Sequence, residues 1–471
     1  MDRFPFLASL ARLRIAQAAL LCALAGCATT LPDVTHLRER LSGTPAPTIV
    51  TSGGEVPPKR REAMLDALAE RVGPTDILAH HVAAEERIAG RPLVAGNKVA
   101  LLDDGPATMR AMREAIAAAS DHVNLETYIF DADEVGHELA DLLIEKRRAG
   151  VVVNVIYDSV GALDTPREFF ERMRAAGIAV LEYNPVNPLY ARGRWEVNQR
   201  NHRKILVVDG QVAFTGGVNI SKVYGKSSLS AGSGEPPPDA RDAAWRDTHM
   251  RIEGPVVADF QEKFLDAWLR QTGHLPPPAN YFPPPRQAGN ALVRAIGTTP
   301  DRGHHAVYKT YISAFVHADR YIHITTAYFV PDREVLQAIT DAARRGVDVK
   351  IIFPSFSDVS LVLHAGRSFY DELLAAGVKI YERKGAMLHA KTAVIDGVWS
   401  TIGSTNLDMR SFLHNDEINA VILDADFARQ METLFQRDLR DSAEIREEEW
   451  KQRGLRVRMR EWAVRLFSYW L

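Results

Sequence analysis

The chain has 471 residues, enough for two domains or two large lobes, and 46% of them are hydrophobic, which is sufficient for well-filled cores. A formal net charge of −3 excludes nucleic-acid binding driven by overall charge, so any anion must be bound by a local cluster of basic residues.

The first 26 residues have the composition of an export signal. Three arginines precede the apolar run from Ile15 to Ala25, which is shorter than the roughly 20 residues that span a bilayer. The run ends in Leu24-Ala25-Gly26-Cys27, which resembles the lipobox of bacterial lipoproteins, where the signal is cut before the cysteine and the thiol is lipidated. We expect Cys27 to anchor an exported chain on a bacterial membrane, with its body in the periplasm. An ordinary signal peptide with an incidental cysteine is the alternative.

The single thiol left after cleavage excludes an internal disulfide framework, because Cys22 lies within the signal. No later segment is long and apolar enough to span a membrane. Residues 27–95 give mixed signals, with a stretch rich in Pro, Thr and Gly and then a helical pattern over Glu62–Arg71. We predict a tether and a small lead-in there.

Strands and helices then alternate twice in the same order, which predicts an α/β fold with two similar lobes at residues 96–273 and 288–440. In the first lobe, strands are expected at 122–130, 151–158 and 178–184, with helices at 134–149 and 166–176. In the second, strands are expected at 321–329, 347–354 and 378–382, with helices at 332–345 and 361–376. The connector 274–287 contains six prolines, which rule out regular helix or sheet.

A motif in the first lobe, within Arg200–Ser221, returns in the second within Met387–Asp408. Five residues recur, each displaced by 187 positions: His202, Lys204, Asp209, Gly216 and Asn219 match His389, Lys391, Asp396, Gly403 and Asn406. Two such copies in register do not arise by chance. Side chains two apart on a strand face the same way, so each histidine is expected to point with its lysine.

The Asp-Gly pairs that follow, Asp209-Gly210 and Asp396-Gly397, lie between strand-like runs and predict hairpin turns. Both aspartates are part of the residue pattern of the motif, but we interpret their role as structural and not as catalytic. Gly216-Gly217 and Gly403-Ser404 permit close backbone approach to a ligand. Asn219 and Asn406 offer amide groups there, so we predict that Asn219, Asn406, Gly217 and Ser404 bind a substrate phosphate.

If the lobes meet, two histidines, two lysines and two asparagines form a site suited to a phosphodiester. Lysines and amides hold its oxygens and stabilise the charge that develops in the transition state. One neutral imidazole can attack phosphorus, and the other, when protonated, can donate to the leaving alkoxide. This explains why the motif occurs twice. The scheme requires no metal and no cofactor.

The duplicated pattern H-x-K-x(4)-D-x(6)-G-[GS]-x-N resembles the signature of the phospholipase D superfamily, over about Asn97–Arg440. The resemblance implies two lobes, each a mixed β-sheet flanked by helices, with the active site at their interface and assembled within one chain. It implies that His202, Lys204, Asp209, His389, Lys391 and Asp396 are the catalytic motif residues. It also implies an acid downstream of each motif that orients a histidine; Asp247 and Glu417 match, with a surface or strand-end acid as the alternative. Gly217, where the second copy has Ser404, is a departure that removes one hydroxyl.

Stretches such as Leu388–Gly397 ("LHAKTAVIDG") and Gly403–Asn419 ("GSTNLDMRSFLHNDEIN") look like bacterial cardiolipin synthases. That resemblance implies transfer of a phosphatidyl group between phosphatidylglycerol molecules, with His202 as our choice of nucleophile. A hydrolytic phospholipase D using water at the same site is the first alternative. A nuclease of the superfamily is less favoured, since lipidation and a net acidic body argue against a nucleic-acid partner. A non-catalytic scaffold is disfavoured because both motifs keep every reactive side chain.

Residues 441–471 are predicted to end the chain as a basic amphipathic helix. Its apolar residues at helical spacing are Leu455, Met459, Trp462, Leu466 and Trp470, with arginines between them. Such a helix suits an anionic membrane surface, and packing on the enzyme's own body is an equal alternative. The same holds for the arginines near the first motif (Arg192, Arg194, Arg200), which suit either lipid phosphate or solvent. Residues 225–242 are interpreted as a disordered insertion, or as a mobile flap. The pairs His80-His81 and His304-His305 are poor metal ligands, since chain neighbours rarely point to one ion.

Overall fold

The computed structural model describes residues 31–470 apart from 35–36, 42, 188, 190–195, 197, 229–242 and 301–303. Residues 34–471 form one compact unit, which is the subject below. The export signal, Cys27, Arg192, Arg194 and most of the 225–242 insertion lie outside the described residues. Among the residues described, no helix has the length and apolar content needed to cross a membrane.

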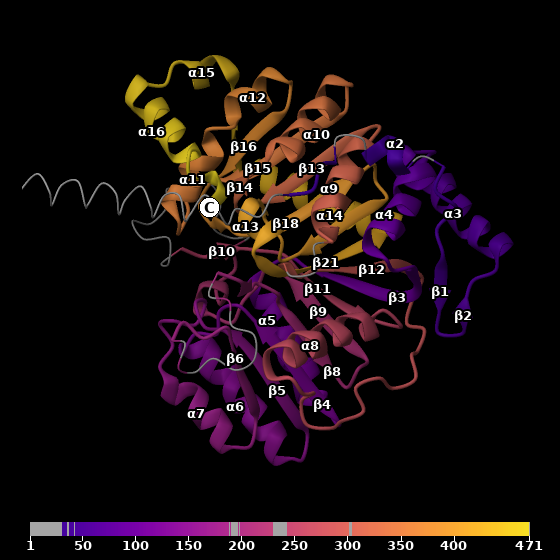
Figure 1. Ribbon diagram of the computed structural model, residues 1–471, viewed down its shortest axis with the longest axis vertical. Coiled ribbons are helices and arrows are strands. Elements are labelled where there is room, and N and C mark those ends of the chain that lie inside the picture. The colour runs from indigo at the N-terminus through magenta and orange to yellow at the C-terminus, as the bar shows by residue number, and fades with distance from the viewer. Residues whose placement is uncertain are drawn as a thin grey trace, which may run out of the picture. The chain divides into compact units, whose positions relative to one another are not determined.

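The first lobe is a mixed sheet with strand order β6-β5-β4-β8-β9-β11-β3, drawn from indigo to magenta in Figure 1. Its strands are β3 (Leu93–Leu102), β4 (His122–Thr127), β5 (Val152–Asp158), β6 (Ala179–Tyr183), β8 (Ile205–Val208), β9 (Val212–Gly216) and β11 (His249–Glu253). Its helices are α5 (Gly105–Ala118), α6 (Glu134–Arg148), α7 (Arg167–Ala175) and α8 (Val257–Thr272). The parallel strands β4, β5 and β6 are joined by helical crossovers, which accounts for the predicted alternation.

The second lobe repeats this order as β16-β15-β13-β18-β19-β21-β12. Its strands are β12 (Ala291–Thr298), β13 (Tyr321–Thr326), β15 (Asp348–Pro354), β16 (Lys379–Arg383), β18 (Lys391–Ile395), β19 (Trp399–Gly403) and β21 (Asn415–Leu423). Its helices are α9 (Ala306–Val316), α10 (Arg333–Arg344), α11 (Ser360–Arg367), α12 (Tyr370–Ala375) and α14 (Ala425–Arg440). Matching helices start in the same way: Asp133 caps α6 and Asp332 caps α10, each accepting a backbone N–H at 3.0 Å. The α/β fold with two similar mixed-sheet lobes is therefore confirmed.

The lobes are joined through their sheets, since β3 pairs antiparallel with β12. Two short parallel ladders also cross between them: β7 (Arg200–Asn201) pairs with β21, and β10 (Trp245–Arg246) pairs with β17 (Met387–Leu388). One apolar core contains side chains from both lobes, including Ile205, Met250, Val394 and Ile418. A shared core and continuous ladders hold the two halves in a fixed relation.

The predicted helix 361–376 is two helices, α11 and α12. The chain turns at Ser368, whose hydroxyl donates to the Ala365 carbonyl at 2.6 Å, and the turn buries the Phe369 ring. The single helix predicted for 441–471 is also wrong in its first part. Residues there form β22 (Ser442–Ile445), which pairs antiparallel with the edge strand β16, before α15 (Glu447–Lys451) and α16 (Leu455–Arg465). An edge strand offers unpaired backbone groups, which outweighs local helical propensity.

The lead-in is part of the folded body. Strand β1 (Ile49–Thr51) pairs parallel with β3, and the predicted helix at 62–71 is α3 (Pro58–Val72). Helix α4 (Val82–Ala89) carries the buried Glu85, which accepts a hydrogen bond from Trp399 at 3.1 Å and pairs with Arg294. The connector 274–287 forms neither helix nor strand, as its prolines predict.

Candidate active site

His202 and His389 line one cavity of about 330 Å³ between the two lobes. His202 lies between β7 and β8, and His389 between β17 and β18, so each histidine lies just before the hairpin of its motif and not within a strand. The reason is that each backbone N–H is bonded across the lobe boundary. His202 donates to the Asp416 carbonyl at 3.0 Å and His389 to the Arg246 carbonyl at 2.8 Å.

Each histidine is paired with the acid of the opposite lobe. Nδ1 of His202 lies 3.0 Å from Oε1 of Glu417 on β21, and Nδ1 of His389 lies 2.7 Å from Oδ2 of Asp247 after β10. Both acids are fully buried. An Nδ1–H that donates to a carboxylate fixes the tautomer, so the Nε2 lone pair of each ring is free for chemistry. The predicted acids are thus where an orienting role requires them, but in crossed pairs.

Both imidazoles are neutral near pH 7. Burial lowers the pKa of His202 to about 4, although the Glu417 carboxylate opposes this. Burial and the Lys391 ammonium hold the pKa of His389 well below its usual value. A neutral ring is the form that can act as a nucleophile or base.

The two lysines are buried beneath the histidines. Nζ of Lys204 donates to the His202 carbonyl at 2.7 Å, and Nζ of Lys391 donates to the His389 carbonyl. Burial lowers the pKa of Lys204 to about 7 and that of Lys391 to about 8. Each ammonium has further N–H groups beyond the one used, so both can contribute positive charge to an anion above them.

Two tyrosines that no motif spacing indicated cover these ammonium groups with their rings. Lys204 Nζ lies 5.4 Å from the centroid of Tyr128, and Lys391 Nζ lies 5.8 Å from that of Tyr328. Both rings line the cavity. They are separated by 200 positions and not 187, so the spacing that relates the motifs does not find them.

Asp209 and Asp396 hold turns and do not line the cavity. Both have φ of 52° and begin the predicted hairpins, β8–β9 and β18–β19. The Asp209 carboxylate accepts the backbone N–H groups of Ser120, Asp121 and His122 at 2.8–2.9 Å. Asp396 does the same for Asp319, Arg320 and Tyr321 at 2.9–3.0 Å. Both oxygens of each carboxylate accept backbone N–H groups at the start of β4 or β13. The geometry therefore gives these two motif residues a structural role and not a catalytic one.

Gly217 and Ser404 lie against the acids and not against the cavity. A Cβ at position 217 would meet Oδ1 of Asp247 at 2.1 Å, so only glycine fits there. Ser404 donates its hydroxyl to Oε2 of Glu417 at 2.5 Å. The difference between Gly217 and Ser404 therefore goes with the difference between the two acids. Glu417 accepts a hydrogen bond from the Ser404 hydroxyl, whereas the shorter Asp247 accepts the Thr248 N–H at 2.7 Å. Neither residue is positioned to bind phosphate directly.

Asn219 and Asn406 do line the cavity. Oδ1 of Asn219 accepts the Ile129 N–H at 3.2 Å, which turns its amide nitrogen toward Tyr224. Oδ1 of Asn406 is buried without a hydrogen-bond partner among the described residues. The Tyr224 hydroxyl lies 3.1 Å from Nδ1 of His389 and is a further contact that no motif spacing indicated.

The remaining wall of the cavity is formed by residues outside the duplicated motif. They are Ile129, Arg200, Trp245, Asp358, Val359, Val362, Asp408, Arg410, Ser411 and Asn415. Burial raises the pKa of Asp408 to about 7, and its carboxylate caps α13 (Met409–Leu413). Among the arginines that suit lipid phosphate, Arg200 is therefore at the site and fully buried.

The histidine pairs outside the motif have structural contacts. Nδ1 of His81 lies 2.9 Å from the Ser313 hydroxyl, and Nδ1 of His305 lies 3.1 Å from the Phe412 carbonyl. In the described part of the chain, no group of three or more His, Cys, Asp or Glu side chains is placed to hold a metal ion.

Comparison with known proteins agrees with this geometry. The family model described as "Cardiolipin synthase, PLD-like domain" matches residues 112–227 and 311–439. The cardiolipin synthase of Geobacillus kaustophilus is 37% identical over 385 residues, covering 81% of this chain and 74% of that protein. Cardiolipin synthase 2 of Bacillus cereus is 35% identical, covering 78% of this chain and 69% of that protein.

The fold also matches a solved structure. The crystal structure of the phosphatidylserine synthase of Haemophilus influenzae covers 82% of this chain and 98% of its own, with a TM-score of 0.61 at 15% identity. At that identity the match speaks for the fold alone. The matched family model, the curated relatives and the paired histidines agree: the chain belongs to the cardiolipin synthase family with PLD-like domains, and is an enzyme of the phospholipase D type.

Proposed function

We propose that the protein transfers a phosphatidyl group from one phosphatidylglycerol to another, through a phosphohistidine, and so forms cardiolipin and glycerol. The observation that carries this proposal is the pair of buried histidines, each held at Nδ1 by an acid of the other lobe, with both rings lining one cavity. The names of the relatives, cardiolipin synthases, support the choice of product.

In the first step, Nε2 of His202 attacks the phosphorus of the donor lipid. The Nε2–P bond forms while the bond from phosphorus to the oxygen of the head-group glycerol breaks. Protonated His389 gives its proton to that departing oxygen. Glu417 stabilises the positive charge that develops on His202. The buried lysines stabilise the charge on the non-bridging oxygens, where low dielectric strengthens their effect.

In the second step, neutral His389 takes the proton of the acceptor's glycerol hydroxyl. The new oxygen–phosphorus bond forms, the Nε2–P bond breaks, and cardiolipin leaves with His202 neutral again. His389 needs its proton only when substrate is bound. Burial and the Lys391 charge hold the pKa of His389 low in the free enzyme, and the negative charge of the bound phosphodiester offsets the Lys391 charge.

We further propose that α16 contacts the membrane surface. Leu455, Met459, Trp462 and Leu466 share one face of the helix and are 61–70% exposed. At 100° per residue, Arg458 and Arg465 flank this face on one side and Arg456 and Arg460 on the other. The opposite face is buried through Val464 and Glu461. Leu455, Met459 and Trp462 also line the groove beside α12 but stay mostly exposed. An exposed apolar stripe between arginines fits an anionic bilayer, so this favours the membrane alternative for the C-terminus over self-packing.

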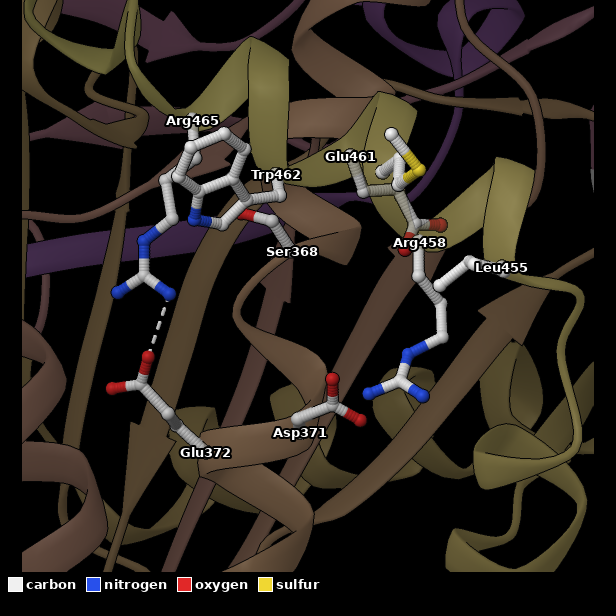
Figure 2. Close-up of a pocket in the computed structure, with 9 residues that line it drawn as sticks. Ser368, Asp371, Glu372, Leu455, Arg458, Glu461, Trp462 and Arg465 are labelled. Carbon is white, nitrogen blue, oxygen red and sulfur yellow. Dashed lines mark hydrogen bonds and ion pairs between the residues drawn. The ribbon is translucent and has the colours of Figure 1, made fainter.

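The surroundings of α16 support the same orientation. Figure 2 shows the groove between α12 and α16, where Arg465 donates to Glu372 at 2.6 Å and so fixes the helix on the second lobe. Helix α16 packs beside α11, where Val359 at the N-cap and Leu361 in the first turn are also exposed apolar residues. Val359 also lines the cavity of the two histidines. A bilayer on this face would lie at the entrance of the active site.

Lipidation at Cys27 and a periplasmic body belong to the same proposal. A lipid-anchored, exported enzyme reaches phosphatidylglycerol at the membrane surface without nucleotide donors, because exchange of one phosphodiester for another needs none. Metabolic labelling with a radioactive fatty acid tests the anchor. Label on the wild-type chain and none on Cys27→Ser supports lipidation, and equal label on both contradicts it.

The reaction is tested with purified protein and phosphatidylglycerol vesicles in a chelating buffer. Cardiolipin and glycerol in equal amounts support transfer. Phosphatidate with glycerol would identify the hydrolytic alternative, and neither product would overturn both. His202→Ala and His389→Ala are each expected to lower turnover by more than about 10³-fold, because each histidine acts in both steps.

A further inference from the structure

The two short ladders that cross between the lobes are equivalent in position but opposite in chemistry. Arg200 on β7 pairs with Asn415 on β21, and their counterparts Met387 on β17 and Trp245 on β10 also pair with each other. Each ladder stands directly before a histidine and an acid of the site. The histidines, lysines and acids are thus duplicated, whereas these flanking residues are not.

The polar ladder has hydrogen-bonding capacity that the protein does not use. Arg200 is 2% exposed; its Nε donates to the Gln199 carbonyl at 2.7 Å and its Nη1 to the Ser159 hydroxyl at 3.0 Å. Its Nη2 has no partner among the described residues, and Nη1 stands 3.5 Å from Asp158.

Asn415, like Arg200, has a buried polar atom without a hydrogen-bond partner among the described residues. Nδ2 of its amide donates to Glu417 at 3.2 Å, which fixes the orientation of the group, and Oδ1 has no partner within the described chain. Both side chains line the cavity. Leaving a buried guanidinium N–H and a buried carbonyl oxygen unpaired costs free energy, which a ligand with an anionic and a hydroxyl group would recover.

The apolar ladder offers nothing comparable. Met387 and Trp245 are buried in the hydrophobic core of the first lobe, and Trp245 presents its ring to the cavity. The reacting phosphate already has the histidines, lysines and acids, which occur twice, one set from each lobe. Arg200 occurs once, on one side, and beyond the contact of its Nη1 with Asp158 it keeps an unpaired Nη2 that can bind a different anion.

We propose that Arg200 and Asn415 form an acceptor subsite, in which the guanidinium binds the phosphodiester of the acceptor phosphatidylglycerol and the Asn415 carbonyl accepts from its glycerol. The inference rests on the proposed function and deepens it. Phosphatidylglycerol carries a phosphate of its own when it acts as acceptor, whereas water and simple alcohols do not. The subsite therefore selects a glycerophosphate acceptor over water, and so directs the phosphohistidine toward transfer.

The experiment compares two water-soluble acceptors that share a glycerol hydroxyl but differ by a glycerophosphoryl group, which carries the phosphodiester that the subsite would bind. Purified full-length enzyme is supplied with phosphatidylglycerol in mixed micelles and with either glycerophosphoglycerol or isotopically labelled glycerol. Wild type is expected to prefer glycerophosphoglycerol by about tenfold or more at equal concentration, the effect of a charge-assisted hydrogen bond. Equal use of the two acceptors overturns the inference while leaving the proposed transfer intact. Absence of cardiolipin together with absence of transfer to either acceptor would instead overturn the proposed function.

Arg200→Met places in the first lobe the residue that the second lobe has at the equivalent position. The preference for glycerophosphoglycerol is expected to fall at least tenfold, and because it is a ratio of two products it is independent of the amount of folded enzyme. The control Met387→Leu conserves volume on the apolar ladder and should keep the wild-type ratio. If Arg200→Met does not fold, Asn415→Asp tests the same site, since a carboxylate there repels the acceptor phosphate. An unaltered ratio in a folded variant contradicts the subsite.

Discussion

Nδ1 of His202 lies 3.0 Å from the Glu417 carboxylate, although 215 positions separate the two residues and they belong to different lobes. The same relation joins His389 to Asp247, 142 positions earlier, at 2.7 Å. Neither lobe contains a histidine together with its acid. The duplicated motif therefore describes two half-sites that become competent only when β7 pairs with β21 and β10 with β17.

The crossed pair is tested by Glu417→Gln. The substitution keeps the shape of the side chain but removes the charge that holds Nδ1–H, so cardiolipin formation should fall by about 10²–10⁴-fold. Glu432→Gln is the matched control, because Glu432 also contacts the Nδ1 of a histidine, His323, at 2.8 Å but does not line the cavity. Comparable activity in the two variants would contradict an orienting role for Glu417.

Asp209→Ala should lower stability and not chemistry. The carboxylate accepts three backbone N–H groups, and its loss is expected to cost about 1–3 kcal/mol of unfolding free energy, measured by urea titration. Turnover per folded molecule should stay within a few-fold of wild type. Asp209→Asn should lose less, because asparagine tolerates positive φ and keeps one acceptor. A loss of activity without a loss of stability would return Asp209 to the catalytic group.

The difference in unfolding free energy between wild type and Asp209→Ala should also depend on pH. Burial raises the pKa of Asp209, but its backbone hydrogen bonds outweigh burial and leave that pKa below the ordinary value. A lowered folded pKa contributes stability above the unfolded pKa, and this contribution is lost as pH falls through the folded pKa. The gap between wild type and Asp209→Ala should therefore narrow in acid.

The pH dependence of kcat/KM should be bell-shaped. His202 must be neutral to attack, so activity should rise as pH increases through its pKa of about 4. His389 must gain a proton for the first step, and its lowered pKa makes that protonation less favourable as pH rises. Lys204 and Lys391 must also be charged to stabilise phosphate, so activity should fall further as pH rises through their pKa values of about 7 and about 8. Initial rates at low substrate report these free-enzyme groups. A rate that keeps rising above pH 9 would show that the lysine charges are not required.

The membrane role of α16 is tested by Met459→Ser combined with Trp462→Ser. Removing these exposed side chains should lower turnover on phosphatidylglycerol vesicles by on the order of tenfold or more, because apolar area that would enter the bilayer is lost. Turnover on detergent-dispersed lipid should change little. Leu275→Ser, an apolar residue of the connector that is 56% exposed, controls for removal of surface apolar area. Equal losses on vesicles and micelles would contradict membrane docking by this helix.

The order of strands and helices was predictable because periodicity is local. The buried run at β5 and the capped helix α6 both lie within one or two residues of their predicted bounds. The candidate acids were indicated only by the resemblance to the phospholipase D superfamily, whereas the duplicated histidines were visible as spacings. Which acid contacts which histidine was not, since that depends on two-residue strands whose pairing is decided by the partner lobe and not by their own sequence.

Other features could not be predicted from the sequence, because they depend on tertiary contacts that the spacing of residues does not indicate. Tyr128 and Tyr328 occupy equivalent places over the lysines, but an insertion between strand and motif shifts their separation away from that of the histidines. The break between α11 and α12 follows from burial of Phe369. Which face of α16 is exposed becomes clear only once Val464 and Glu461 are seen to face the body of the protein.

The most direct test of the account uses a donor lipid whose leaving group is p-nitrophenol, which departs without protonation. His389→Ala should then release about one equivalent of p-nitrophenolate per enzyme in a rapid burst, and mass spectrometry of the quenched protein should locate the phosphatidyl group on His202. His202→Ala should show no burst. A burst in His202→Ala with the adduct on His389 would contradict the assignment of the nucleophile, and a reaction with no adduct on either histidine would contradict the phosphohistidine mechanism itself.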